Sequence, residues 1–294
     1  MTAPADPRHA AEGVDTVIRL HDPSRLEELR RAVLSVAAQE HRPQHVLVCT
    51  QRFDGAAQAA LRAALEPILA WSGLTATLAN HPEPEPPDGR AVLANLGIAR
   101  ARGRYLGFLD HDDLLLGGAH AHLIGRLRAS GAAIAFGRTP AVPTLVSGPL
   151  LLAQGRRQPF TGRSLGELFR ANFAPLHSWL LDRARLPEGL LRLEPMLTRE
   201  EDYDLLLRVC AAAPADFSGI EHAVGLYVQK SDGTNTLPLD ATAEVDDLEE
   251  EARIFVEGRR RITLLAPAVQ RALGLAEPEP GLTIRAWLDR QDGG

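Results

Sequence analysis

Residues 104–113 read RYLGFLDHDD, an apolar run that ends in a cluster of carboxylates. The Tyr, Leu and Phe side chains after Gly103 predict a strand in the interior of a parallel sheet. In such sheets ligands bind beyond the carboxyl ends of the strands, which is where Asp110, Asp112 and Asp113 stand. We therefore expect a site at that edge of the sheet.

The acidic cluster has two interpretations. On an extended chain Asp110 and Asp112 point the same way, which suits ligands of Mn²⁺ or Mg²⁺, and His111 between them points away. An Asp-rich turn that closes the strand explains the same residues without a ligand, with Asp113 capping a helix that begins near Leu114.

The segments around the cluster alternate between strands and helices. This β-α-β order predicts parallel pairing with right-handed crossovers. Residues 81–89 carry four prolines within six positions and predict an extended loop, while residues 140–159 and 173–181 show no clear periodicity. We predict strands at 14–20, 45–50, 74–78, 104–110, 132–136 and 222–229, and helices at 26–37, 56–70, 91–102, 119–129, 164–169 and 198–213.

The composition is that of a globular protein. With 294 residues, 45% hydrophobic, the chain can bury a full core. A net charge of −6 provides no basic field for nucleic acid, so we expect no nucleic-acid partner. Cys49 and Cys210 lack metal-ligand spacing, and residues 1–13 lack the apolar stretch of a signal peptide. A cytoplasmic location is the expectation.

Three blocks, taken in order, carry a family resemblance. Residues 95–114 (NLGIARARGRYLGFLDHDDL) resemble the central block of glycosyltransferase family 2 up to its D-x-D motif. Residues 25–39 are similar to the first helix of that family, with Ser35 and Gln39 forming its terminal S-x-x-x-Q. Residues 201–208 (EDYDLLLR) resemble its E-D-x-D-L-x-x-R element. Together they cover roughly residues 14–236, and three ordered blocks are more specific than any single one.

The resemblance implies the GT-A fold, a Rossmann-like, mainly parallel α/β sheet flanked by helices. A GT-A domain would span residues 14–240, divided into a nucleotide-sugar and metal half (14–115) and an acceptor half (116–240). Residues 241–294 would form a C-terminal helical appendage. The implied activity is transfer of a sugar from a nucleoside diphosphate sugar to an acceptor hydroxyl, with inversion and assisted by Mn²⁺ or Mg²⁺. The implied setting is the synthesis of bacterial cell-surface polysaccharide or glycoconjugates, with a glycan or lipid-linked acceptor.

The family pattern assigns the general base to Asp202, with Glu201 as its neighbour. A helix-capping role is the alternative for Glu201, because residues 198–201 (TREE) fit a capping box in which Glu201 reaches back to a backbone amide. Asp204 and Arg208, four residues apart, are expected to form an ion pair along the helix.

Six residues are expected at the donor site by the same resemblance. Thr50 and Gln51 stand where the family usually carries acids that contact the nucleotide base, so base recognition is altered or the site is degenerate. Lys230 stands in the loop expected to close over the donor phosphates, where Arg or His is usual. The donor-site residues are Thr50, Gln51, Arg90, Asn95, Asp110 and Lys230.

Two further functions compete with an active transferase. The Thr50–Gln51 departure favours a catalytically silent GT-A domain that serves as a binding or scaffold module in glycan assembly. A nucleotidyltransferase requires a Gly-rich phosphate loop after the first strand, and residues 20–23 (LHDP) are not one.

The basic cluster Arg259–Arg261 also has two interpretations. With Ile262, Leu264 and Leu265 it suits peripheral docking on the inner face of the plasma membrane. An ordinary amphipathic packing helix explains the same residues.

Overall fold

The computed structural model describes residues 7–147, 150–231 and 247–293. Its main sheet has seven strands in the order β10-β6-β9-β4-β1-β2-β3, and only β9 runs antiparallel to its neighbours. The strands are β1 (Val14–Leu20), β2 (Gln44–Gln51), β3 (Thr75–His81), β4 (Tyr105–Asp110), β6 (Ile134–Phe136), β9 (Trp179–Asp182) and β10 (Ala215–Asp216). This mixed, mainly parallel sheet confirms the predicted fold class.

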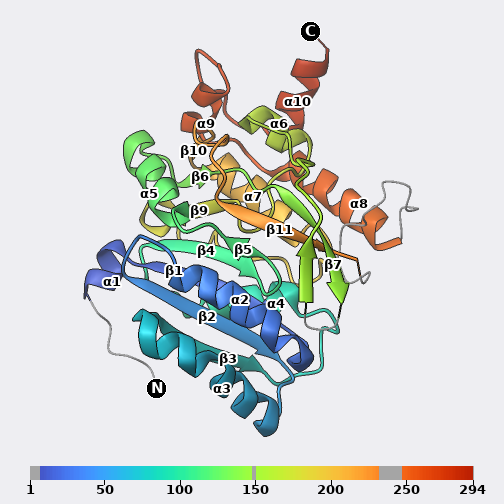
Figure 1. Ribbon diagram of the computed structural model, residues 1–294. Helices are drawn as coiled ribbons and strands as arrows, with labels where there is room; N and C mark the ends of the chain where they lie inside the picture. Colours follow the sequence, from blue (N-terminus) through green and yellow to red (C-terminus); the bar gives the residue numbers. More distant parts are fainter. Residues whose placement is uncertain (1–6, 148–149, 232–246, 294) are drawn as a thin grey trace.

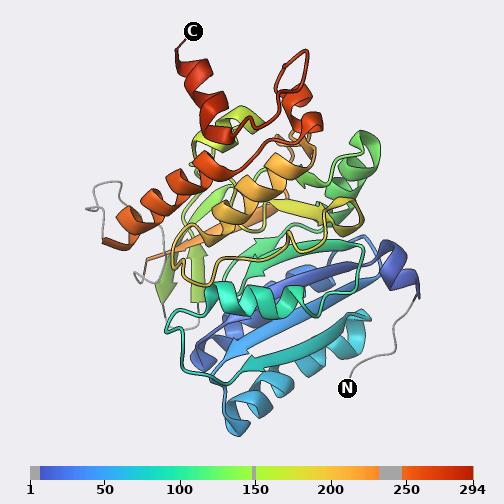
Figure 2. The ribbon, with the colours of Figure 1, turned by 180° about the vertical axis from the view of Figure 1, so that it is seen from behind.

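Helices cover both faces of the sheet (Figures 1 and 2). The strand residues alternate accordingly: Val46 and Val48 pack with the α2–α3 side, whereas Leu47 and Cys49 pack with the α4–α7 side. Burial on both faces explains why these strands are apolar throughout. The flanking helices are α2 (Leu26–Ala37), α3 (Gly55–Ser72), α4 (Arg90–Ile98), α5 (Ala119–Ser130), α6 (Leu165–Arg170) and α7 (Glu201–Ala212).

A second, smaller sheet has the order β5-β11-β7-β8. Its strands are β5 (Leu114–Leu115), β7 (Ala141–Ser147), β8 (Leu150–Ala153) and β11 (Gly225–Lys230). Periodicity did not reveal β7 and β8, because β7 begins with four buried residues and all four residues of β8 are exposed. Neither strand therefore alternates between apolar and polar residues along its length.

The C-terminal helices α8 (Asp247–Ile262), α9 (Pro267–Ala272) and α10 (Ile284–Asp292) pack beside α6 and α7 (Figure 2). Val256, Ile284 and Trp287 belong to the same buried cluster as residues of α4 and α7. This segment thus contributes to the main core and is more than a surface appendage. The predicted boundary at 240–241 lies outside the described residues.

The basic cluster on α8 is turned largely toward the protein. Arg259 Nε donates to Asp204 Oδ1 (2.5 Å), and Arg260 Nη2 donates to the Tyr203 hydroxyl (2.9 Å). The side chain of Arg261 is 69% exposed and lies near Glu257. Two of its three charges thus pair with internal partners, as the packing-helix interpretation expects, while Ile262 and Leu264 are exposed.

Among the described residues, no helix combines the length and apolar character needed to cross a bilayer.

Candidate active site

The acidic cluster forms a turn rather than an extended chain. Asp110 ends β4, and the Asp113 amide donates back to the Asp110 carbonyl (3.1 Å). The alternation expected of a strand therefore stops at Asp110. As a result, Asp110 and Asp112 do not share one ligand set, and the expectation that His111 points away does not hold.

Asp110 is bound by Arg19 from the neighbouring strand. Because β1 and β4 are parallel and in register, Arg19 lies opposite Asp110, and its Nη2 and Nε donate to Asp110 Oδ1 at 2.6 and 3.0 Å. Arg19 Nη1 also donates to Glu201 Oε1 (2.7 Å). Burial by itself raises the pKa of Asp110, but the Arg19 charge more than offsets this and lowers that pKa below its usual value.

Glu201 therefore does not cap its own helix. The N-cap of α7 is Glu200, in the left-handed region (φ 60°) with no side-chain capping bond, and the predicted capping box is wrong. Instead, the carboxylate of Glu201 is buried against Arg19. The pattern of residues 198–201 carried no information about this partner, since Arg19 is 182 positions away.

Asp202 lines a cleft of about 560 Å³. Burial raises its pKa well above the usual value, and the adjacent charges of Glu201 and Glu200 raise it further. Its Oδ1 accepts the Tyr203 amide (2.7 Å). A carboxyl with a raised pKa that lines a cleft is a candidate general base.

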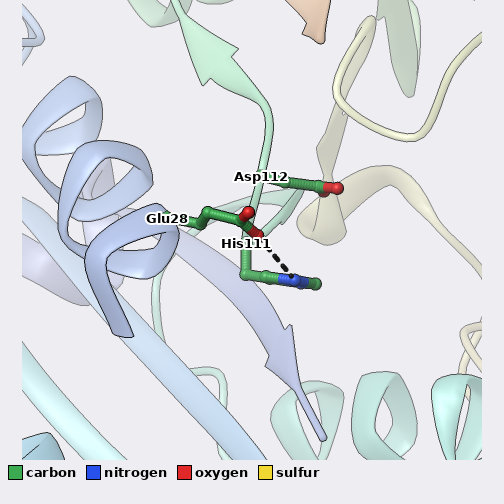
Figure 3. Close-up of side chains that lie close together, drawn as sticks. All are labelled: Glu28, His111 and Asp112. Atoms are coloured by element: carbon green, nitrogen blue, oxygen red, sulfur yellow. Dashed lines mark ion pairs between the residues drawn. The ribbon is translucent and has the colours of Figure 1, made fainter. Parts of the chain in front are cut away.

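A possible metal-binding group combines one predicted and two unpredicted ligands (Figure 3). Ligand atoms of Glu28, His111 and Asp112 lie within 4.8 Å of one another. Two carboxylates and an imidazole suit Mn²⁺, whereas Mg²⁺ prefers oxygen ligands and would use the two carboxylates alone. Glu28 lies in the first turn of α2 and His111 and Asp112 in the turn after β4, which explains why sequence spacing could not reveal the set.

Cations of the chain itself surround this group. Lys230 Nζ lies 3.0 Å from Asp112 Oδ2 and 3.4 Å from Glu28, and Arg25 lies 3.0 Å from Glu28. Burial raises the pKa of Glu28, but the hydrogen bond to His111 and the charges of Lys230 and Arg25 lower that pKa to about 2.

Asp113 does not cap a helix, because residues 114–115 form β5 and α5 begins only at Ala119. Its carboxylate accepts the Val228 amide (2.8 Å) and lies 3.3 Å from His177 Nδ1. Asp113 therefore fastens the acidic turn to β11. Burial, with the charges of Asp112 and Asp110, raises its pKa well above the usual value.

Four of the predicted donor-site residues, Thr50, Gln51, Asn95 and Lys230, line neither of the two clefts at the acidic turn. The Thr50 hydroxyl donates to Asn80 Oδ1 (3.0 Å), and Gln51 Nε2 donates to the Pro86 carbonyl (2.8 Å) beneath the proline-rich loop. Both side chains are buried, so contact with a nucleotide base is not available in this conformation. Asn95 pairs with the backbone N–H and C=O of Leu193 and connects α4 to the segment that precedes α7.

Two adjoining clefts meet at the acidic turn. The larger, of about 560 Å³, contains Asp202 together with Glu249 and Arg253 of α8. The smaller, of about 360 Å³, lies between the acidic turn and the loop at 87–89. Both volumes lie in the range of small-molecule sites. The residues lining both are Arg19, Arg90, Asp110, Asp113 and Tyr227.

Arg90 lies at the junction of the clefts. Its guanidinium is paired with Asp88, with a shortest distance of 2.6 Å. Arg19 was missed by the sequence analysis, although a signal exists: it is the one basic residue of β1, a strand in which all seven residues are buried.

Solved glycosyltransferases share this architecture. The 1–349 fragment of TarS from S. aureus in complex with UDP-GlcNAc matches with a TM-score of 0.59 and 13% identity, over 87% of this chain and 68% of that one. The same fragment in complex with UDP matches with a TM-score of 0.55 and 12% identity, over 74% of this chain and 60% of that one. A third match is the mannosyltransferase PcManGT from Pyrobaculum calidifontis in complex with GDP-Man and Mn²⁺. Its TM-score is 0.51 at 15% identity, over 94% of this chain and 69% of that one.

No protein-family model and no curated protein match the sequence. The chain spans 60% of the length of the UDP-bound TarS fragment, less than two thirds. At these identities the likeness concerns the fold alone, and this fold is the GT-A fold of nucleotide-sugar glycosyltransferases.

Proposed function

We propose that this protein transfers a sugar from a nucleoside diphosphate sugar to an acceptor hydroxyl, with inversion. The observation that carries the proposal is the pair of clefts meeting at the acidic turn: Asp202 lies in one, and Asp112 and His111 line the other. Donor and acceptor would then approach each other across the Asp110–Arg19–Glu201 bridge. The named complexes of the structural neighbours contain UDP, UDP-GlcNAc and GDP-Man, which supports a donor of this class.

In this proposal Asp202 accepts the proton of the acceptor hydroxyl. The oxygen forms its bond to the anomeric carbon as the bond to the diphosphate breaks on the opposite face, which inverts the configuration. Arg90 and Arg19 supply positive charge beside the departing diphosphate. Mn²⁺ or Mg²⁺ held by Asp112, with Glu28 and His111, would stabilise the charge on the leaving group.

The larger cleft offers aromatic rings of Phe160, Tyr203 and Tyr227 beside carboxylates and arginines, which suits a sugar with both apolar faces and hydroxyl groups. A cell-surface glycan or a lipid-linked glycan is therefore our acceptor class.

A thermal-shift screen of nucleoside diphosphates with and without Mn²⁺, followed by transfer assays with a panel of donor sugars, tests the proposal. We expect one nucleotide to raise the melting temperature and its sugar derivatives to be consumed. Failure of every donor to be transferred or hydrolysed would contradict the proposal.

A catalytically silent GT-A domain is the second candidate. It is favoured by the burial of Thr50 and Gln51 and by the internal cations that pair with Asp110 and Asp112. This candidate predicts nucleotide binding without turnover, whereas measurable turnover that Asp202→Asn abolishes excludes it.

A further inference from the structure

Lys230 is the only lysine in the chain, since every other one of the 32 Lys and Arg residues is an arginine. It ends β11, and its side chain is 2% exposed. Unlike the planar guanidinium of arginine, its ammonium is a compact point charge with three donors on a flexible stem. The single departure from arginine thus falls beside the acidic turn.

The ammonium of Lys230 occupies the carboxylates that a metal would need. It lies 3.0 Å from Asp112 Oδ2 and 3.4 Å from both oxygens of Glu28, and these two residues are ligands of the possible metal group. A divalent ion bound to the same oxygens would be a close neighbour of the ammonium. Two cations at that separation repel each other strongly where the surroundings are largely buried.

We propose that Lys230 and a divalent cation are alternative occupants of the Glu28–Asp112 carboxylates, so that metal binding displaces the ammonium. This inference rests on the metal assistance of the proposed function. Without metal, Lys230 neutralises the acids and holds β11 against α2. With metal, the ammonium leaves the cluster and becomes exposed.

Amine acetylation of the wild-type protein tests the displacement directly. Lys230 is the single lysine, so intact-mass and peptide measurements report this residue, with the α-amine as an internal control. We expect Mn²⁺ to increase the acetylation rate of Lys230 severalfold and to leave the α-amine rate unchanged. An unchanged Lys230 rate at a concentration where Mn²⁺ is bound would overturn the proposal.

Mn²⁺ titration without nucleotide, followed by electron paramagnetic resonance, provides the second measurement. Removal of a charge-assisted contact that competes with the ion should tighten binding about tenfold in Lys230→Met. Lys230→Arg retains the competing charge and should bind close to the wild-type value. The control is Arg30→Met, which removes a positive charge that pairs with Glu27 on the same helix α2.

Equal Mn²⁺ affinities of Lys230→Met and the wild type would overturn the proposed competition between Lys230 and the metal. A lack of Mn²⁺ binding by every variant would overturn it as well. Neither result decides the proposed transfer reaction, because nucleotide binding and donor consumption are measured separately in the wild type. Conversely, a confirmed competition with no turnover of any donor leaves the Lys230 assignment intact and contradicts the transferase.

Discussion

Arg19 is the residue on which the centre of the site depends. It bridges Asp110 and Glu201, and its side chain is 7% exposed. Burial lowers the pKa of a guanidinium, but these two carboxylates more than offset this and raise the pKa of Arg19 above its already high usual value. The Arg19 guanidinium therefore stays charged at neutral pH.

Arg19→Met should cost about 3 kcal/mol of folding free energy, because it leaves two carboxylates without their buried partner. Urea unfolding at pH 7 measures this loss. The control Arg30→Met, which breaks a pair with an exposed Glu27 carboxylate, should change stability by less than about 0.5 kcal/mol. A loss equal to that of the control would show that the bridge contributes nothing.

Asp202→Asn should lower the transfer rate by about 10²–10⁴-fold, because the amide cannot accept the acceptor's proton. Binding of the nucleoside diphosphate should be retained. In the wild type the rate should fall as the pH drops through the raised pKa of Asp202, at a pH above the 3.8 of an ordinary aspartate. A pH–rate profile and a nucleotide titration check both statements.

The same raised pKa predicts the sign of a stability change. The folded state binds the Asp202 proton more tightly than the unfolded state does. This proton therefore stabilises the folded state fully below pH 3.8, and the stabilisation is lost as the pH rises through the folded-state pKa. Asp202→Asn should therefore be more stable than the wild type at neutral pH, and the difference should shrink toward pH 4. Denaturant unfolding at both pH values measures it, and a difference independent of pH would contradict it.

At the scale of elements, helix α2 and the residues that follow it position the acidic turn. Ser35 Oγ accepts the Leu115 amide (3.1 Å), while Gln39 Nε2 donates to the Leu116 carbonyl (2.8 Å) and its Oε1 accepts the His120 amide (3.0 Å). The S-x-x-x-Q motif thus binds the backbone that leaves the acidic turn. This role explains why a motif on a helix accompanies an acidic motif far along the chain.

Gln39→Ala should cost about 1–3 kcal/mol, because buried backbone groups at 116 and 120 lose their partners. Thermal or urea unfolding measures the loss. The exposed Gln154→Ala is the matched control and should have little effect. Equal effects of the two substitutions would show that Gln39 does not support the turn.

At the scale of the whole molecule, the C-terminal helices complete the core and the larger cleft. Trp287 is 5% exposed and its ring meets that of Phe169 edge to face, with centroids 6.2 Å apart. Glu249 and Arg253 of α8 line the cleft that contains Asp202. The segment therefore shapes the larger cleft as well as stabilising the core.

Trp287→Ala should cost about 3–5 kcal/mol, the usual range for removing a large buried side chain. Unfolding should remain a single transition, since α10 shares its core with α6 and α7. Far-UV circular dichroism and fluorescence, compared across urea, test this. Trp71→Ala, at a 66% exposed position, is the control, and a separate early transition would contradict a shared core.

Much of the fold was predictable because it depends on local patterns. The strands at 14–20 and 105–110 and the helix at 26–37 agree with the structure nearly to the residue, since buried runs and helical spacing are properties of adjacent residues. The pair β7 and β8 escaped prediction because burial, which decides their pattern, depends on what the rest of the chain covers.

The sequence by itself determined the α/β class, the order of its elements and the place of the acidic turn at the end of a central strand. Only the tertiary structure decided the partners of that turn: Arg19 for Asp110, and Glu28 with Lys230 for Asp112. The physical reason is that strand and helix formation follows neighbours along the chain, whereas charge pairing acts through space. Lys230 lies 118 positions beyond Asp112, and no local pattern of residues records such a contact.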